Sequence, residues 1–297
     1  MIELSLDGTD AALARLQHEL DIRREALSLR RSAPVSWAGA GIYTETLDAM
    51  ERALKLPDWT YFINASGSCL PLGGSAWIQR LLQEHSTRGW LGFCDSVVLQ
   101  EPMIWISSQR EAIPLTHCHS LTAYDRVQWL LDPSLRELMD QGRIDPARRI
   151  EMWVGLMYTE TGKNSFWVRP LSTRELGERA ASLAEQPLRY GCNRVVLHRS
   201  IVEWLPGSDI LQRVRTFLKG CFIGDEMIFA MTLSSQENPY RSAMCADNLR
   251  HWQGGPKRIP LEEIPDLISA GNRLMVRKIA QDDFHAAAQL VRSANRA

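Results

Sequence analysis

The chain has 297 residues, of which 45% are hydrophobic and 23% are charged, and its formal net charge is -1 at pH 7. A near-neutral charge gives no general attraction to nucleic acid or acidic membranes. No run approaches about 18 uninterrupted apolar residues, which argues against a transmembrane helix, and the start of the chain lacks the basic and apolar regions of a signal peptide. The 6 cysteines are scattered without a C-x-x-C pair, as expected of a reduced, cytoplasmic protein.

Strands and helices alternate in the N-terminal part of the chain. Alternating apolar residues predict a strand over residues 2–6, and a helix capped at residue 9 or 10 is expected to follow. Apolar residues at helical spacing predict another helix over residues 42–55. The β-rich run at residues 59–64 predicts a buried strand, after which Ser75 is expected to cap a further helix.

The remaining elements are less regular. In the middle we predict strands near residues 104–107 and 150–156 and a helix near residues 124–131. The C-terminal third predicts, in order, a turn and strand at residues 187–197, helices at 201–205, 226–233 and 260–270, and a short strand or turn at 274–279.

This alternation indicates an α/β fold with a mostly parallel mixed sheet flanked by helices. There is no internal repeat and no obvious linker, so we predict a single domain over residues 1–297. Ligands of such sheets bind outside the carboxyl ends of the strands, which makes the loop after Asn64 a candidate wall of the binding site.

Motifs for dinucleotide binding, for a P-loop, for a nucleophile elbow and for a zincin site are absent. His117 and His119 can share one face of a strand, but no second cluster at zinc spacing accompanies them, and we expect no metal site. The chain also lacks a D-x-D motif, so a nucleotide-sugar transferase with this sequence would need another counter-charge for its diphosphate.

Gly224, Asp225 and Glu226 precede the predicted helix at residues 226–233. Asp225 is well placed as an N-cap, and Glu226 then lies in the first turn, where the helix dipole favours the ionised carboxylate. An ionised and oriented carboxylate is what a general base requires. The alternative interpretation is an acidic helix start without a chemical role.

Several segments, taken in order, resemble the core-2/I-branching β-1,6-N-acetylglucosaminyltransferase family, which includes peptide O-xylosyltransferases. In the N-terminal part they are a tryptophan turn with Trp37 and the strand and loop of residues 61–72 with Asn64, Ser66 and Gly67. In the C-terminal part they are the segment 191–197 with Arg194, the pair Asp225-Glu226 and the segment 247–250. The last are a helix and a basic end at residues 261–266, 269–271 and 274–278.

The resemblance implies a GT-A-like fold and an inverting, metal-independent glycosyltransferase that moves a GlcNAc- or xylose-type sugar from a UDP-sugar to a hydroxyl of a glycan or glycoconjugate. Residues 1–85 would form the nucleotide side, 86–185 a variable middle, and 186–285 the acceptor and catalytic half. Its implied site consists of the general base Glu226, the diphosphate-binding residues Arg250 and Lys278, and the substrate-binding residues Asn64, Ser66, Gly67, Trp37, Asp225 and Arg194, with no metal or other cofactor.

Three departures from the family pattern bear on this function. The aspartate of the family's loop is Cys69, and the serine and tryptophan of its glycine–serine–x–tryptophan strand are Cys192 and Arg194, which predicts a different acceptor. The family's first strand is not clearly present, so either the nucleotide site is rearranged or another element or chain completes it.

Two rival functions therefore remain, a non-catalytic carbohydrate-binding or scaffold homologue and a GT-A transferase with a distant metal site. The resemblance, together with the missing anchor, predicts a bacterial enzyme of surface-polysaccharide synthesis. We expect it in the cytoplasm, free or at the inner face of the membrane, with no nucleic-acid partner.

Overall fold

A computed structural model of the protein describes residues 2–6, 27–32, 40–98, 128–131, 154–160, 163–169, 181–183, 189–219, 224–253 and 257–294. The chain divides into two compact units, each assembled from separate segments. Unit 1 contains residues 1–49, 100–185 and 213–225, and unit 2 contains residues 50–99, 186–212 and 226–297. The single domain expected from the sequence stays a prediction.

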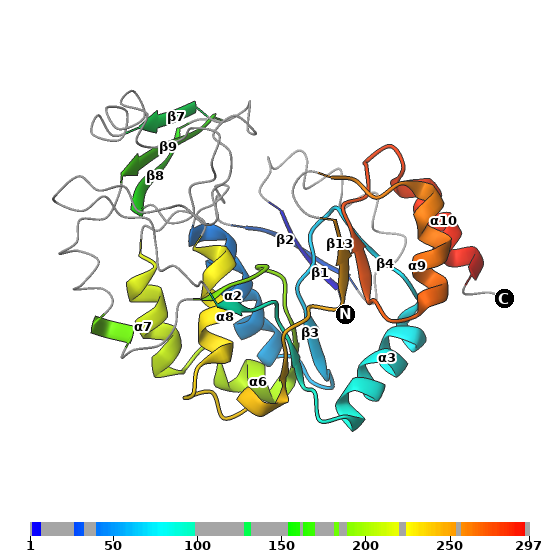
Figure 1. Ribbon diagram of the computed structural model, residues 1–297, viewed down its shortest axis with the longest axis horizontal. Coiled ribbons are helices and arrows are strands. Elements are labelled where there is room, and N and C mark those ends of the chain that lie inside the picture. The colour runs from blue at the N-terminus through cyan, green and yellow to red at the C-terminus, as the bar shows by residue number, and fades with distance from the viewer. Residues whose placement is uncertain are drawn as a thin grey trace. The chain divides into compact units, whose positions relative to one another are not determined.

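Unit 1 contains two small sheets (Figure 1). In one of them β1 (Ile2–Leu6), the strand predicted at this position, pairs in parallel with β2 (Leu27–Arg31). In the other, β9 (Lys163–Arg169) lies between β7 (Gln128–Leu131) and β8 (Val154–Glu160), parallel to the first and antiparallel to the second.

The helix predicted near residues 124–131 is wrong over its last four residues, because these form β7. A short apolar run fits a helix or a strand equally well by periodicity, and pairing with β9 decides the matter here. The 150–156 strand begins later than predicted, as β8, and the strand predicted near residues 104–107 lies outside the described residues. The helix predicted over residues 42–55 is confirmed as α2 (Ala40–Leu54), which begins in unit 1.

The first sheet of unit 2 has the strand order β12 (Met244–Cys245), β5 (Gly92–Phe93), β11 (Val196–His198) and β3 (Tyr61–Ile63). Strand β11 runs antiparallel to both of its neighbours, whereas β12 is parallel to β5. The strand predicted at residues 59–64 is confirmed as the shorter β3.

The second sheet of unit 2 has the order β13 (Arg250–Trp252), β14 (Met275–Arg277) and β4 (Cys69–Pro71). Strands β13 and β14 are parallel and are joined through α9 (Ile264–Ala270), and β14 is antiparallel to β4. A further short antiparallel pair consists of β6 (Val97–Val98) and β10 (Arg189–Tyr190).

The predicted α/β class is confirmed, but the described sheets are mixed rather than mostly parallel. A crossover helix gives parallel neighbours, as for β13 and β14, whereas β3 and β11 come from distant parts of the chain and pair in the opposite direction.

Four predicted helices of the described chain are confirmed with small shifts at their ends, as α3 (Ser75–Thr87), α6 (Arg199–Trp204), α8 (Asp225–Ser234) and η4 (Leu261–Glu263) followed by α9. The sequence analysis did not predict η2 (Ala181–Leu183), α7 (Asp209–Phe217), η3 (Arg241–Ala243) and α10 (Phe284–Ala294). Two predicted caps are wrong by one residue. The N-cap of α3 is Gly74, with Ser75 already helical, and α8 includes Asp225 as its first residue. No helix within the described ranges is both long and apolar enough to cross a membrane.

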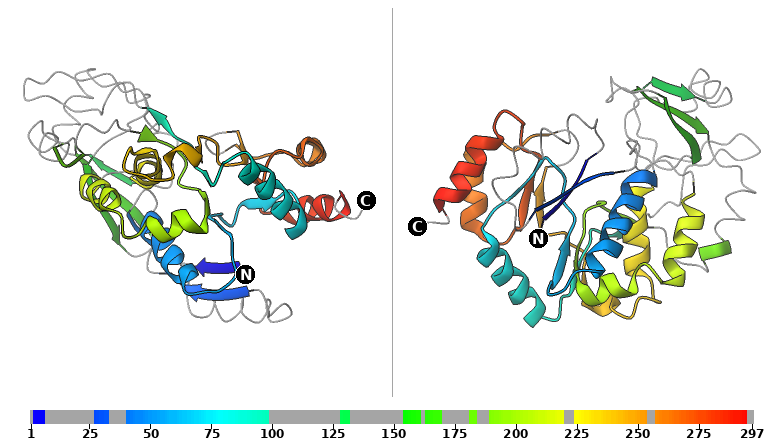
Figure 2. Two further views of the ribbon diagram at one scale, coloured as in Figure 1. Left: turned by 90° about the horizontal axis from the view of Figure 1, so that it is seen from below. Right: turned by 180° about the vertical axis from the view of Figure 1, so that it is seen from behind.

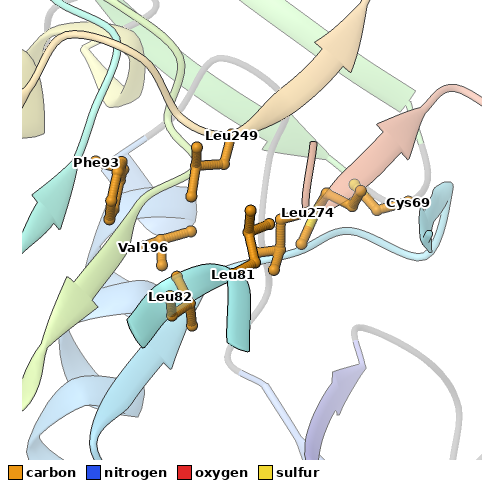
Figure 3. Packing of buried hydrophobic residues seen from close by; sticks show 8 residues of the cluster. Cys69, Leu81, Leu82, Phe93, Val196, Leu249 and Leu274 are labelled. Carbon is orange, nitrogen blue, oxygen red and sulfur yellow. The ribbon is translucent and has the colours of Figure 1, made fainter. Parts of the chain in front are cut away.

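The core of unit 2 has two parts, one on each face of the second sheet. The first connects both sheets with α3 and consists of Cys69, Leu81, Leu82, Phe93, Val196, Leu249, Leu274 and Met275 (Figure 3). The second lies under α9 and α10, which contact each other and lie next to each other in the right view of Figure 2. It consists of Leu70, Leu72, Ile259, Ile264, Val276, Ile279, Ala287 and Val291.

The alternation of side chains along β4 and β14 places the candidate cations. Leu70 and Val276 face α9 and α10, so their neighbours face the other way. Arg277 pairs with Cys69, and Arg250 pairs with Met275, so both arginines lie on the face that is turned away from α9 and α10. This face carries the candidate site.

Candidate functional site

Asn64 ties the end of β3 to the segment that precedes β11. Its backbone N–H donates to the carbonyl of Val195 at 2.9 Å, which extends the pairing of these strands by one residue. Its side-chain nitrogen donates to the carbonyl of Asn193 at 3.0 Å, and its side-chain oxygen accepts a hydrogen bond from Nη1 of Arg194 at 3.1 Å. Asn64 therefore fixes the position of the Arg194 guanidinium.

The loop after Asn64 is closed by Cys69, the residue that replaces the family's aspartate. The Cys69 backbone N–H donates to the Ser66 carbonyl at 2.9 Å. Its sulfur lies 3.5 Å from the Ser66 nitrogen and 3.2 Å from the Ser66 hydroxyl. Ser68 accepts a hydrogen bond from Ile279 at 3.2 Å, while Gly67 is exposed. The thiol thus closes this loop, and the substitution leaves the loop ordered.

The segment Gly191–Arg194 links three of the predicted site residues. The Gly191 N–H donates to the backbone carbonyl of Glu226 at 2.7 Å, and the Cys192 sulfur accepts a hydrogen bond from Nη1 of Arg250 at 3.1 Å. A glycine at position 191 lets the segment pass close to the backbone of Asp95. A Cβ atom at this position would lie 1.8 Å from the carbonyl oxygen of Asp95.

Arg250 is presented by a tight turn with an unusual backbone. Leu249 has a φ of 54°, a left-handed conformation that costs a residue with a side chain roughly 1–2 kcal/mol. Two short side chains stabilise it, since Oδ1 of Asp247 accepts from the Leu249 N–H at 2.8 Å and Oδ1 of Asn248 accepts from the Arg250 N–H at 3.1 Å. The turn therefore fixes the direction in which Arg250 leaves the backbone.

Two further contacts hold this turn from outside. Nδ2 of Asn248 donates to Oδ2 of Asp95 at 2.7 Å, and Arg273 forms an ion pair with Asp247. Burial raises the pKa of Asp95 and Asp247 raises it further, whereas the charge of Arg250 acts in the opposite direction. Asp95 is thus a partial counter-charge of Arg250.

Arg250 is nearly enclosed, with 6% of its surface exposed. Its contact with Cys192 satisfies one nitrogen, but its buried Nε has no hydrogen-bond partner among the residues that the structure describes. A buried guanidinium with an unused N–H is suited to an anionic ligand, because the low local dielectric strengthens its pull on a negative charge.

Glu226 and Lys278, the predicted base and one of the predicted diphosphate-binding residues, come together in space. Burial lowers the pKa of Lys278 and the neighbouring Arg277 lowers it further, whereas the negative charge of Glu226 raises it. Glu226 is the second residue of α8 and Lys278 directly follows β14, so the two groups come from distant segments of the chain.

Arg194, Arg250, Arg277 and Lys278 form the cation cluster of the site. The charges of Arg277 and Arg250 both act on Arg194, and the charge of Arg277 acts on Lys278. Sequence reasoning missed Arg277, although its place directly before Lys278 in a basic run was a usable signal. It also missed Cys192 as the partner of Arg250, a long-range contact for which no local pattern exists.

Other predicted positions are not placed in the site. Trp37, His117 and His119 lie outside the described residues. Asp225 belongs to unit 1, starts α8 and is buried, with 4% of its surface exposed. In the described part of the chain, no group of three or more His, Cys, Asp or Glu side chains is arranged to hold a metal ion.

The model of one protein family, described as Branch: Core-2/I-Branching enzyme, matches residues 10–91. The members of this family are glycosyltransferases. The resemblance predicted from the sequence is confirmed over this range, which includes the loop with Asn64, Ser66 and Gly67 and ends before Glu226. A search of curated proteins gives no match to the chain.

Proposed function

We propose that this protein is an inverting, metal-independent glycosyltransferase of GT-A type that moves a GlcNAc- or xylose-type sugar from a UDP-sugar to a hydroxyl of a glycan or glycoconjugate. The observation that carries this proposal is that the segment Gly191–Arg194 contacts both the backbone of Glu226 and the guanidinium of Arg250, while the charge of Glu226 acts on Lys278. The family match of residues 10–91 supports the reaction class independently of that observation.

Glu226 acts as the general base in this mechanism. Its carboxylate takes the proton of the acceptor hydroxyl as the oxygen attacks the anomeric carbon. Attack from the face opposite to the leaving group inverts that carbon through an oxocarbenium-like state, as in inverting glycoside hydrolysis. The hydrogen bond between Gly191 and the Glu226 carbonyl fixes the backbone from which this carboxylate projects.

The leaving UDP gains negative charge as the glycosidic bond breaks, and Arg250 and Lys278 stabilise that charge. Arg250 offers a planar fork and Lys278 a point charge, which together suit a diphosphate. Because the turn of residues 247–250 fixes Arg250 before substrate arrives, little reorganisation is needed during the reaction.

The positive charges of Arg250 and Lys278 take the role that a divalent cation has in D-x-D transferases. Lys278 contributes less of that charge at high pH than an ordinary lysine would, because burial and Arg277 lower its pKa. The cytoplasm, or the inner face of the membrane, remains our proposal for the location.

The rival function, a carbohydrate-binding or scaffold protein that has lost its nucleotide site, rested partly on Cys69. Because Cys69 closes the loop at residues 66–69 through its backbone and its sulfur, its presence is no sign of a collapsed site. The two functions differ in whether the native protein binds UDP.

Calorimetric titration with UDP tests the proposal. We expect binding by the wild type, a raised melting temperature in the presence of UDP, and a loss of affinity on the order of 10²-fold in Arg250→Ala and in Lys278→Ala. Arg80→Ala, which removes an exposed arginine on α3, is the control for net charge. Equal UDP affinity in the wild type and both site variants would reject the assigned residues, and no binding by the wild type would favour the scaffold.

A further inference from the structure

Arg194 has no carboxylate neighbour among the described residues, in contrast to Arg250 and Lys278 of the same cluster. Arg250 has Asp95 and Lys278 has Glu226 as opposing charges. The charges that act on Arg194 come from Arg277 and Arg250 and from the thiols Cys192 and Cys69. No Asp or Glu in the described residues lies within ion-pair distance of it.

The guanidinium of Arg194 also has an open edge. Nη1 donates to Oδ1 of Asn64 at 3.1 Å, which orients the plane of the group. The Nε atom is buried and has no hydrogen-bond partner among the described residues. The residue as a whole is half-buried. Nε and Nη2 form the side of the fork that binds a carboxylate or phosphate in a bidentate manner.

A half-buried cation beside two other arginines is costly to keep without an anion. Taking a charge out of water is repaid only when an opposite charge and well-placed hydrogen bonds replace the water. The hydrogen bond that Arg194 donates to the neutral Asn64 amide orients the guanidinium but supplies no opposite charge. An anionic group of a bound molecule would supply the opposite charge that the described residues do not provide.

We propose that Arg194 binds a carboxylate or phosphate that the substrate carries in addition to its diphosphate, so that the donor or the acceptor is an acidic sugar. This inference rests on the proposed function, in which Arg250 and Lys278 take the diphosphate. It makes Arg194 a specificity residue for uronic acids or phosphorylated sugars over neutral sugars.

Calorimetry in two arms tests this and distinguishes the two sources of the anion. The donor arm compares UDP-glucuronic acid with UDP-glucose. The acceptor arm compares, with and without UDP, a glucuronate-bearing and a phosphate-bearing oligosaccharide with their neutral counterpart. We expect a preference for the acidic compound of at least about tenfold in one arm, and we expect Arg194→Gln to remove it.

Two measurements separate this role from its alternatives. Affinity for UDP alone should stay within about twofold in Arg194→Gln, whereas a loss equal to that of Arg250→Ala would make Arg194 another diphosphate ligand and overturn the inference. Arg80→Gln, the exposed control on α3, should keep the preference. The absence of any acidic preference in the wild type, or its survival in Arg194→Gln, also overturns the inference.

The proposed function can fail separately from this inference. If the wild type binds no UDP but prefers an acidic oligosaccharide through Arg194, the transferase proposal is wrong and the anion site stands. The melting temperature of Arg194→Gln without ligand should be equal to or above that of the wild type, because an uncompensated charge is removed and glutamine can still donate to Asn64.

Discussion

At the scale of single residues, Glu226 carries the chemistry of the proposed reaction. Glu226→Gln keeps the size of the side chain but cannot accept a proton. We expect a transfer rate lower by roughly 10²- to 10⁴-fold, with UDP-sugar affinity and melting temperature close to those of the wild type. Measurement of kcat and of UDP-sugar affinity for the purified variant checks this.

Asp225 is the matched control for Glu226, because it is the preceding carboxylate of the same helix. Asn is nearly the same size as Asp and keeps an oxygen acceptor at this buried first position of α8. We therefore expect only a mild loss of kcat in Asp225→Asn. If the Asp225→Asn variant is inactive while the Glu226→Gln variant is active, the base has been assigned to the wrong carboxylate.

Lys278 makes the affinity for UDP depend on pH. Burial and Arg277 lower the pKa of its ammonium group, so Lys278 loses its charge at a lower pH than an ordinary lysine. Affinity for UDP should be full below that pKa and should fall as the pH rises through it. In Lys278→Arg the guanidinium stays protonated, so the decline should disappear. UDP titrations of both proteins across the alkaline range check this. An identical decline in affinity in the two proteins would exclude Lys278 as the titrating group.

At the scale of elements, the segment Gly191–Arg194 holds the site together. A methyl group on Gly191 would lie 1.8 Å from the carbonyl oxygen of Asp95. Gly191→Ala must therefore displace the segment and with it the contacts to Glu226 and Arg250. We expect the free energy of unfolding, measured by urea denaturation, to fall by about 1–3 kcal/mol. The transfer rate, measured by UDP release, should fall as well.

Gly207→Ala is the control for this substitution. A Cβ atom at Gly207 meets nothing within 4 Å, and the residue is exposed in the turn after α6. Its free energy of unfolding should equal that of the wild type within error. If Gly191→Ala behaves in the same way, the close approach of Gly191 to Asp95 does not constrain the fold.

Elements whose apolar spacing repeats over several turns were predictable from the sequence, as α2 shows. Residues 128–131 were not, because a short apolar run becomes a strand only by pairing with a distant segment, here β9. The start of α8 was predicted to within one residue, since a helix end depends on geometry that composition only suggests.

The site shows the same division between local and long-range information. Glu226, Arg250 and Lys278 were identified from the resemblance, and in the structure the charge of Glu226 acts on Lys278 while Arg250 belongs to the same cation cluster. The hydrogen bond from Arg250 to Cys192 joins residues 58 positions apart, and nothing in either local sequence indicates it. Such contacts follow from the arrangement of the sheets.

At the scale of the whole molecule, the site depends on the assembly of unit 2. Its residues come from the loop after β3, the segment before β11, the start of α8, the turn before β13 and the end of β14. The family model matches residues 10–91, so it covers the first of these segments. The catalytic roles of the others rest on geometry and chemistry, and a measurement of activity must test them together.

The most direct measurement is UDP release from a panel of UDP-sugars, with and without candidate acceptors, in excess EDTA. The proposed mechanism predicts release from at least one UDP-sugar at a rate that added manganese does not raise, because Arg250 and Lys278 stabilise the leaving diphosphate. Absence of release from every UDP-sugar tested, or release only after manganese is restored, would contradict it.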